Sequence, residues 1–361
     1  MTLHSLAPAV LTPAAKTPNT APTAPTKTDP SSTKGLVLRQ MLRPVAAYLS
    51  NDEVREITIP RPGTIFLRIK GQWIEREAPE LTLDYLDALV AAMANYNNVT
   101  FAPIMSLKLL DGERGQVMQP PAVLDGTISL NIRKHSSVVK SLDELTHEGA
   151  FDDWTDISAP IPRPDQLSEV DRQLIEFKQQ RDMRSFLEYA VLSHKNIIIG
   201  GKTGSGKTTF ARSLIERIPT DERLITIEDV HELFLPDHPN RVHLLYGNGV
   251  GQVSATDCVA ACMRSSPDRI FLSELRGSEA WEYLTALNTG HPGSITTTHA
   301  NNARDIFERV AMLIKQSVAG NQIDVQTLRE YLFSTLDIAL FFANYKLAQV
   351  YFNPLRSRVI T

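Results

Sequence analysis

The feature that most constrains the fold is a glycine-rich segment that follows a short apolar run. Residues 201–208 read GKTGSGKT and match the phosphate-loop pattern GxxxxGK[ST], and NIII stands just before them at 196–199. In such a loop the glycines let backbone N–H groups cradle phosphate oxygens, while Lys207 reaches the β and γ phosphates and Thr208 offers its hydroxyl to Mg²⁺. The residues predicted to bind a nucleotide are therefore Gly201, Lys202, Thr203, Gly204, Ser205, Gly206, Lys207, Thr208 and Thr209.

Around this loop the chain alternates between strand-length apolar runs and helical patterns. Phe210, Leu214 and Ile218 fall on one helical face directly after the loop, and the apolar runs LITI and RIFL follow further on. Strands without polar alternation, separated by helices, indicate a mostly parallel sheet that is covered on both faces. The segment DIALFFANYKLAQVYF predicts a late hairpin on that sheet. We therefore predict an α/β domain over 181–361.

The earlier part of the chain has a different pattern, typical of a small α+β domain over 35–138. EVREITI and TIFLRIKGQWIERE read as strands, and LTLDYLDALVAAMANY reads as an amphipathic helix. In TISLNIRK, the apolar residues Ile128, Leu130 and Ile132 alternate with polar ones. Arg133 therefore points away from the core of its own domain.

Two segments lack a strong pattern of either kind. Residues 1–34 are rich in Pro, Thr and Ala, a composition that buries too little apolar surface to offset its ordering entropy, and they predict a flexible tail. Residues 139–180 contain a cluster of prolines and predict a linker between the domains, running into a helix near 170–180.

Composition excludes several classes of protein. The net charge of −4 gives no overall electrostatic footprint for wrapping duplex nucleic acid. The two cysteines, Cys258 and Cys262, lie one helical turn apart and predict packing residues in a reducing, cytoplasmic compartment. No apolar run approaches the roughly 18 residues that span a bilayer, so any membrane contact is expected to be peripheral. A secretory signal is not expected either, because the N-terminus lacks an apolar core with a cleavage site.

Acidic residues follow two of the predicted strands, at the edge where open α/β sheets bind ligands. Glu228 and Asp229 end LITIED, and Glu274 ends RIFLSE, where Ser273 stands at the position at which many phosphate-loop enzymes carry a metal-binding Asp. Phosphoryl transfer needs such carboxylates to hold the metal ion and orient water. The residues alone leave open which carboxylate abstracts the proton.

A third element is GHPGSITTTH, a turn that leads into a polar strand ending at His299. Thr296, Thr297 and Thr298 are poor candidates for a fully buried strand, so we expect this stretch to line something polar. Our hypothesis is that it senses the γ-phosphate through the neighbouring strand. The other interpretation of His299 is a hydrogen-bonded packing residue.

Four blocks, in order along the chain, resemble the secretion traffic ATPases, most closely the VirB-type hexameric ATPases of type IV secretion systems. They are GKTGSGKTT, the Asp-box-like RLITIEDVHEL, the Walker-B-like RIFLSELRG and the His-box-like GHPGSITTTHA. The resemblance covers most of residues 36–355. It implies a RecA-like phosphate-loop domain, a smaller PAS-like N-terminal domain, and a homo-hexameric ring that binds ATP and Mg²⁺ between the two domains.

The resemblance also implies roles for individual residues. Glu228 would be the base or water-orienting residue with Asp229 in support, Glu274 would act in the metal shell with Thr208, and His299 would couple the nucleotide to the sheet. In such ATPases the N-terminal domain supplies arginines to the phosphates. The matching candidates here are Arg114, in LLDGERGQV, and Arg133.

The function implied is an ATP-hydrolysing motor that powers pilus biogenesis or substrate translocation. Its expected partners are other type IV secretion components, namely the coupling protein, a second secretion ATPase and inner-membrane channel proteins, and its expected place is the cytoplasmic side of the inner membrane. Two alternatives remain: a nucleotide-gated assembly scaffold, and a nucleic-acid motor on a RecA-like core. The acidic pI argues against the second, although direct nucleic-acid binding stays open.

Overall fold

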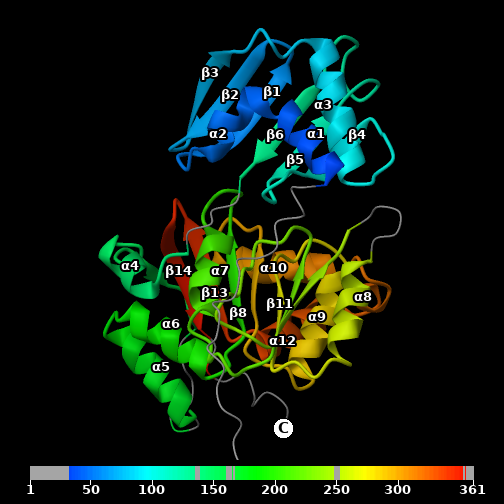
Figure 1. The fold of residues 1–361 in the computed structure, drawn as a ribbon. Helices are drawn as coiled ribbons and strands as arrows, with labels where there is room; N and C mark the ends of the chain where they lie inside the picture. Colours follow the sequence, from blue (N-terminus) through cyan, green and yellow to red (C-terminus); the bar gives the residue numbers. More distant parts are fainter. Residues whose placement is uncertain are drawn as a thin grey trace, which may run out of the picture.

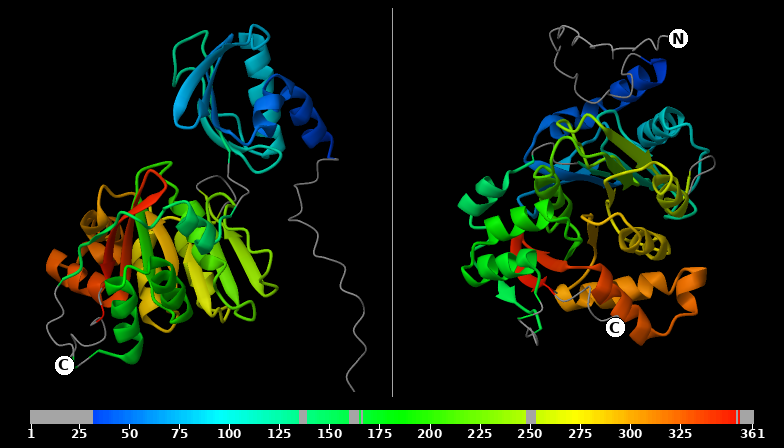
Figure 2. Two further views of the ribbon diagram at one scale, coloured as in Figure 1. Left: turned by 90° about the vertical axis from the view of Figure 1, so that its left-hand side faces the viewer. Right: turned by 90° about the horizontal axis from the view of Figure 1, so that it is seen from below.

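The computed structural model describes a smaller and a larger domain, which Figure 1 and the left view of Figure 2 show one above the other. The described residues are 32–134, 139–159, 165, 167–247, 253–352 and 354. Nearly all of the predicted tail, 1–34, lies outside them, and Ser32 already caps the first helix by accepting a hydrogen bond from the N–H of Gly35. Within these ranges no helix combines the length and apolar content needed to cross a membrane.

The smaller domain is an antiparallel sheet with helices packed against it. In spatial order its strands are β3 (Gln72–Glu77), β2 (Thr64–Ile69), β1 (Val54–Arg61), β6 (Ser129–Arg133), β5 (Arg114–Met118) and β4 (Ile104–Lys108). Its helices are α1 (Thr33–Met41), the 3₁₀ turn η1 (Arg43–Val45), α2 (Ala46–Ser50) and α3 (Leu83–Tyr96). In β6 the alternation is as predicted, because Leu130 and Ile132 are buried in the core and Arg133 is exposed.

The larger domain holds two groups of strands. The first is parallel and contains β10 (Arg241–Leu245), β9 (Leu224–Glu228) and β11 (Arg269–Leu272). The second contains β12 (Ile295–Thr298), β8 (Ile197–Gly201), β13 (Ile338–Ala343), β14 (Lys346–Phe352) and β7 (Thr155–Asp156). The predicted hairpin is β13 and β14, which pair antiparallel.

Helices cover both faces of these strands (Figure 1), as the continuous apolar runs predict. Ile197 and Ile199 of β8 face one core, and Ile198 faces the other. The first core is covered by α4 (Leu142–His147), α5 (Glu169–Gln179), α6 (Met183–Leu192) and α7 (Lys207–Ile215). The remaining helices are α8 (Ala255–Cys262), α9 (Glu279–Asn288), α10 (Ala303–Ile314), α11 (Val318–Asn321) and α12 (Val325–Thr335), with both cysteines of α8 buried.

The segment predicted as a linker, 139–180, differs from that expectation because most of its described residues belong to the larger domain. Trp154 is 5% exposed and packs in the first core. The next two residues form β7, which adds to the edge of β14. α4 and β7 are short and carry no repeating apolar period, so the pattern that identifies longer elements is missing from them. The helix expected near 170–180 is present as α5.

The threonines of β12 are buried, contrary to the expectation that they are poor candidates for a fully buried strand, although Thr297 also lines the space beside the phosphate loop. Two of their hydroxyls donate to backbone carbonyls at the end of β11. Thr296 donates to the carbonyl of Leu272 at 2.6 Å, and Thr297 donates to the carbonyl of Ser273 at 2.8 Å. The N–H of Leu275 also donates to the carbonyl of Thr297. Side-chain hydroxyls thus join β12 to β11 where a regular ladder is missing, which satisfies polar groups that burial would otherwise leave unpaired.

We expect Thr296→Val to lower the free energy of unfolding by about 1–2 kcal/mol, because valine keeps the shape but removes a donor from a buried carbonyl. Urea denaturation followed by circular dichroism measures the change. Thr100→Val, at an exposed position, is the matched control and should be neutral. Equal stabilities of Thr296→Val and the wild type would mean that the hydroxyl seam does not hold β12 to β11.

Candidate active site

The phosphate-loop segment has the strand, loop and helix that its pattern predicts. It runs from β8 through residues 202–206 into α7, and Gly204 and Gly206 have φ values of 75° and 97°, where only glycine is unstrained. At Gly201, a Cβ atom would lie 2.4 Å from the carbonyl oxygen of Phe342 on β13. The close approach of backbones around the loop therefore explains why glycine stands at this position.

The amine of Lys207 lies folded over the loop. Its Nζ donates to the carbonyls of Gly201 at 2.9 Å and Lys202 at 3.0 Å. Burial lowers the pKa of Lys207, and the nearby carboxylate of Glu274 opposes this shift. An anion bound in the loop would compensate the same charge, so the lysine is placed to bind phosphate.

Carboxylates from β9 and β11 meet beside the loop, and an arginine joins them. Arg276 forms ion pairs with Asp229 and with Glu274, the latter with a hydrogen bond of 2.7 Å from Nε to Oε2. Burial disfavours its charge, but the two carboxylates outweigh burial and raise the pKa of Arg276. Sequence reasoning missed this residue, although it stands directly after the strand, in the block RIFLSELRG.

His299, at the end of β12, contacts the same carboxyl group. Its Nε2 lies 2.7 Å from Oε1 of Glu274. Burial lowers the pKa of His299, with the Glu274 carboxylate acting in the opposite direction. A histidine that contacts Glu274 in the cleft is more than a packing residue, so the structure brings these two candidates together.

The two arginines predicted in the smaller domain are neighbours. Arg114 of β5 and Arg133 of β6 stand directly opposite each other in the antiparallel pair. Nη1 of Arg114 donates to Oδ2 of Asp229 at 3.0 Å across the two domains. The positive charge of Arg133 contributes to lowering the pKa of Lys207. Like charges directly opposite on paired strands are destabilising. This pair therefore points to a site for an anion.

All these groups line one cleft between the domains, with a volume of about 2330 Å³. Ordinary small-molecule pockets measure roughly 300–1,000 Å³, so the cleft is larger than a nucleotide requires. Its lining includes residues 202–209, Arg114, Arg133, Asp229, Glu232, Ser273, Glu274, Arg276 and His299. The predicted site residues are thus brought together, except for Gly201 and Glu228, which do not line the cleft. Gly201 ends β8, and its carbonyl accepts the amine of Lys207.

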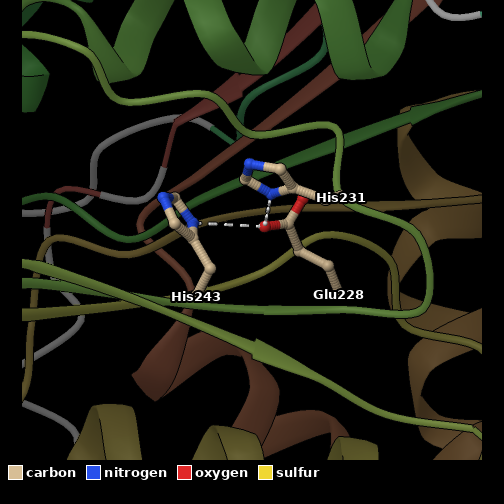
Figure 3. A group of neighbouring side chains, drawn as sticks. All are labelled: Glu228, His231 and His243. Carbon is tan, nitrogen blue, oxygen red and sulfur yellow. Dashed lines mark hydrogen bonds and ion pairs between the residues drawn. The ribbon is translucent and has the colours of Figure 1, made fainter. Parts of the chain in front are cut away.

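Glu228 is fully buried and does not line the cleft. Its Oε2 accepts the backbone N–H groups of Glu232 and Leu233, at 2.6 and 2.7 Å. Its Oε1 faces the rings of His231 and His243 (Figure 3). Glu228 therefore holds the loop after β9, and Asp229, the next residue, reaches the cleft.

The residues beside the loop fit a hydrated Mg²⁺ ion. Thr208 is in the first turn of α7 and lines the cleft together with Glu274. The hydroxyls of Ser205 and Ser273 are buried without a hydrogen-bond partner among the described residues. Hydroxyl and carboxylate oxygens, completed by water and phosphate, are the ligands that Mg²⁺ prefers. Thr208 and Glu274 could therefore hold this ion.

Comparisons with known proteins agree with this arrangement. The family described as Type II/IV secretion system protein matches residues 165–336. The VirB11 protein of the type IV secretion system of Bartonella quintana (strain Toulouse) is 37% identical over 345 residues, covering 91% of this chain and 96% of its own. The sequence alternatives, a scaffold or a nucleic-acid motor, are not favoured by these relatives.

Solved structures give the same result. The crystal structure of the VirB11 ATPase of Brucella suis in complex with sulphate is 34% identical, with a TM-score of 0.51, and covers 90% of this chain and 100% of its own. The Legionella pneumophila ATPase DotB, at 18% identity, covers 91% of this chain and 82% of its own with a TM-score of 0.54, which shows the fold alone. The expected fold, a RecA-like ATPase domain with a smaller α+β domain before it, is confirmed. The chain belongs to the VirB11 family of type IV secretion system ATPases.

Proposed function

We propose that this protein hydrolyses ATP in the cleft between its domains, with Mg²⁺, as a homo-hexameric motor of a type IV secretion system. The observation that carries this proposal is the convergence of the phosphate loop, two strand-end carboxylates and the arginines of the smaller domain on one cleft. Similarity to VirB11 proteins over nearly the whole chain supports the secretion role.

In the proposed reaction the phosphate loop binds the nucleotide, and Lys207 exchanges its two backbone carbonyls for phosphate oxygens. Glu274 orients the attacking water, because its carboxylate lines the cleft between His299 and Arg276. When bound through Thr208 with Glu274 nearby, Mg²⁺ would neutralise charge on the phosphates. The geometry thus favours Glu274 over Glu228 as the water-orienting residue.

The arginines supply the link between chemistry and domain movement. Arg114 now contacts Asp229, and Arg276 contacts both carboxylates. Phosphate oxygens compete for these guanidinium groups because an arginine binds phosphate as well as it binds carboxylate. Binding and release of phosphate would therefore change the contact of Arg114, which belongs to the smaller domain, with the larger domain.

The proposed setting is the cytoplasmic side of the inner membrane, with contact to the membrane at most peripheral. The partners would be the coupling protein, the second secretion ATPase and the inner-membrane channel proteins. The transported substrate is not defined by the cleft, since the cleft residues named above act on a nucleotide and its metal ion. Direct nucleic-acid binding is not part of the proposal.

The proposal is tested by steady-state ATPase activity across protein concentration, with the oligomeric state measured by light scattering. We expect activity to rise cooperatively as rings form. Arg114→Ala and Arg133→Ala should each lower kcat by about a thousandfold or more, since an arginine at a phosphoryl transition state carries an effect of that size. Arg76→Ala, on the exposed edge strand β3 of the same domain, is the matched control.

Activity that is independent of concentration, or arginine variants as active as Arg76→Ala, would contradict the motor mechanism. Thermal unfolding of each variant separates a loss of chemistry from a loss of folding.

A further inference from the structure

A cluster of three ligand-type side chains lies outside the ATPase cleft. Glu228 ends β9, His231 lies in the loop that follows, and His243 is in the neighbouring strand β10. Neither histidine lines the cleft, and in Figure 3 both rings turn a nitrogen toward the same carboxylate. We call these three residues the Glu228 cluster.

The distances in the Glu228 cluster suit a metal ion. Nδ1 of His231 lies 3.1 Å and Nδ1 of His243 lies 3.5 Å from Oε1 of Glu228. All three ligand atoms lie within 4.8 Å of one another. A tetrahedral zinc site with bonds of 2.0–2.2 Å separates its ligand atoms by about 3.3–3.6 Å. An ion would therefore fit between these atoms with small adjustments.

Hydrogen bonds already hold the carboxylate of Glu228 in the orientation that a metal ligand needs. Its Oε2 is held by the two backbone N–H groups of the following loop, and the hydroxyl of Thr226 donates to Oε1 at 2.6 Å. Burial favours the protonated acid, but hydrogen bonds from the histidines, Thr226 and the loop outweigh burial and lower the pKa of Glu228. The contacts from Thr226 and the loop would remain beside a bound ion as outer contacts that fix the direction of the carboxylate.

The histidines leave a route for an ion and for a fourth ligand. Glu228 is fully buried, whereas the side chains of His231 and His243 are 28% and 24% exposed. Both rings would bind through Nδ1 and carry their proton on Nε2. On binding, His231 would exchange its hydrogen bond to Glu228, and His243 its 2.8 Å hydrogen bond with the hydroxyl of Thr226, for a bond to the ion. Two imidazoles and one carboxylate, with water in the fourth position, form a common ligand set for zinc.

We propose that Glu228, His231 and His243 form a binding site for a divalent transition-metal ion, with Zn²⁺ as the best match. The ion would join β10 to β9 and to the loop that begins at Asp229. It would thus fix the loop that carries Asp229 and Glu232 into the cleft without taking part in hydrolysis. This site does not depend on the proposed ATPase function.

The test uses the full chain without an affinity tag, stripped of metal with a chelator and kept in Mg²⁺. Zn²⁺ is titrated in competition with a chromophoric chelator, and Co²⁺ is titrated while its visible absorption is recorded. We expect one ion per chain and a Co²⁺ spectrum typical of tetrahedral coordination. His231→Asn and His243→Asn should each weaken binding by at least about a hundredfold, since removal of outer-shell partners alone costs 10–100-fold.

His147→Asn, at an exposed position on α4, is the matched control and should bind like the wild type. Circular dichroism confirms that each variant is folded, and zinc-edge X-ray absorption of the wild type reports nitrogen and oxygen ligands without any substitution. The proposal is overturned if the wild type binds no Zn²⁺, which would leave a hydrogen-bonded cluster only. It is also overturned if both histidine variants bind as tightly as His147→Asn.

Discussion

Replacing Glu274 by glutamine is expected to lower kcat for ATP hydrolysis by about a hundredfold to ten-thousandfold, the range typical of a lost general base. Glutamine keeps the size of the side chain but removes the charge that faces Arg276 and His299. Nucleotide affinity should change little, because Lys207 and the loop backbone remain. Steady-state kinetics, together with binding of a fluorescent nucleotide, separates the two effects.

The matched comparison is Glu228→Gln, the change at the carboxylate that the family resemblance implied as the base. Its amide oxygen can accept the N–H groups of Glu232 and Leu233, and its amide N–H₂ group can donate to Nδ1 of a histidine. We therefore expect a folded variant with kcat within about tenfold of the wild type, below the usual effect of a lost base. A loss as large as that of Glu274→Gln would return the water-orienting role to Glu228.

The contrast between Glu228 and Glu274 shows which feature of the site sequence patterns do not predict. Both stand at the carboxyl ends of apolar strands, and the strand-end rule correctly brought that edge of the sheet to the cleft. The rule does not state which side chain turns inward. At β9 the answer depends on His231 and His243, which bind Glu228 from the next loop and the next strand. No local period encodes that contact.

The arginines show the opposite case. Strict alternation in TISLNIRK placed Arg133 on the face away from the core, and the register then puts Arg114 beside it. A period of two residues is a local property, so it survives folding. Arg276 follows its strand outside any regular element, and its role depends on carboxylates from two strands. Periodicity therefore found Arg133, the family resemblance supplied Arg114, and neither pointed to Arg276.

A second large effect is expected at Arg269, a charge buried inside the larger domain. Its side chain is 0% exposed, and Nε and Nη2 donate to the two carboxylate oxygens of Glu222, at 2.6 and 2.8 Å. Nη1 donates to the carbonyl of Val191 at 2.7 Å and contacts that of Gly293 at 3.3 Å. One guanidinium group thus joins the start of β11 to the end of α6 and the turn before β12.

We expect Arg269→Ala to destabilise the protein by about 3–5 kcal/mol, because it leaves the Glu222 carboxylate without its guanidinium partner inside the domain. It also removes a donor from the carbonyl of Gly293, while the carbonyl of Val191 keeps the N–H of His194. For a domain of this size, each kcal/mol shifts the melting temperature by roughly 2–4 °C, so a fall of about 6–20 °C should be measured. Arg329→Ala is the matched control, because Arg329 forms a largely exposed ion pair with Glu308. It should change the melting temperature little.

The double variant Arg269→Met with Glu222→Gln separates the two origins of this effect. If the unpaired carboxylate causes most of the loss, neutralising Glu222 should recover a large part of it, since replacing a buried ion pair by residues of similar volume is often close to neutral. If the double variant melts as low as Arg269→Met alone, the loss lies in the carbonyls of Val191 and Gly293. The guanidinium would then act chiefly by satisfying the backbone turns that hold β12 beside the phosphate-loop strand, rather than by its charge pair.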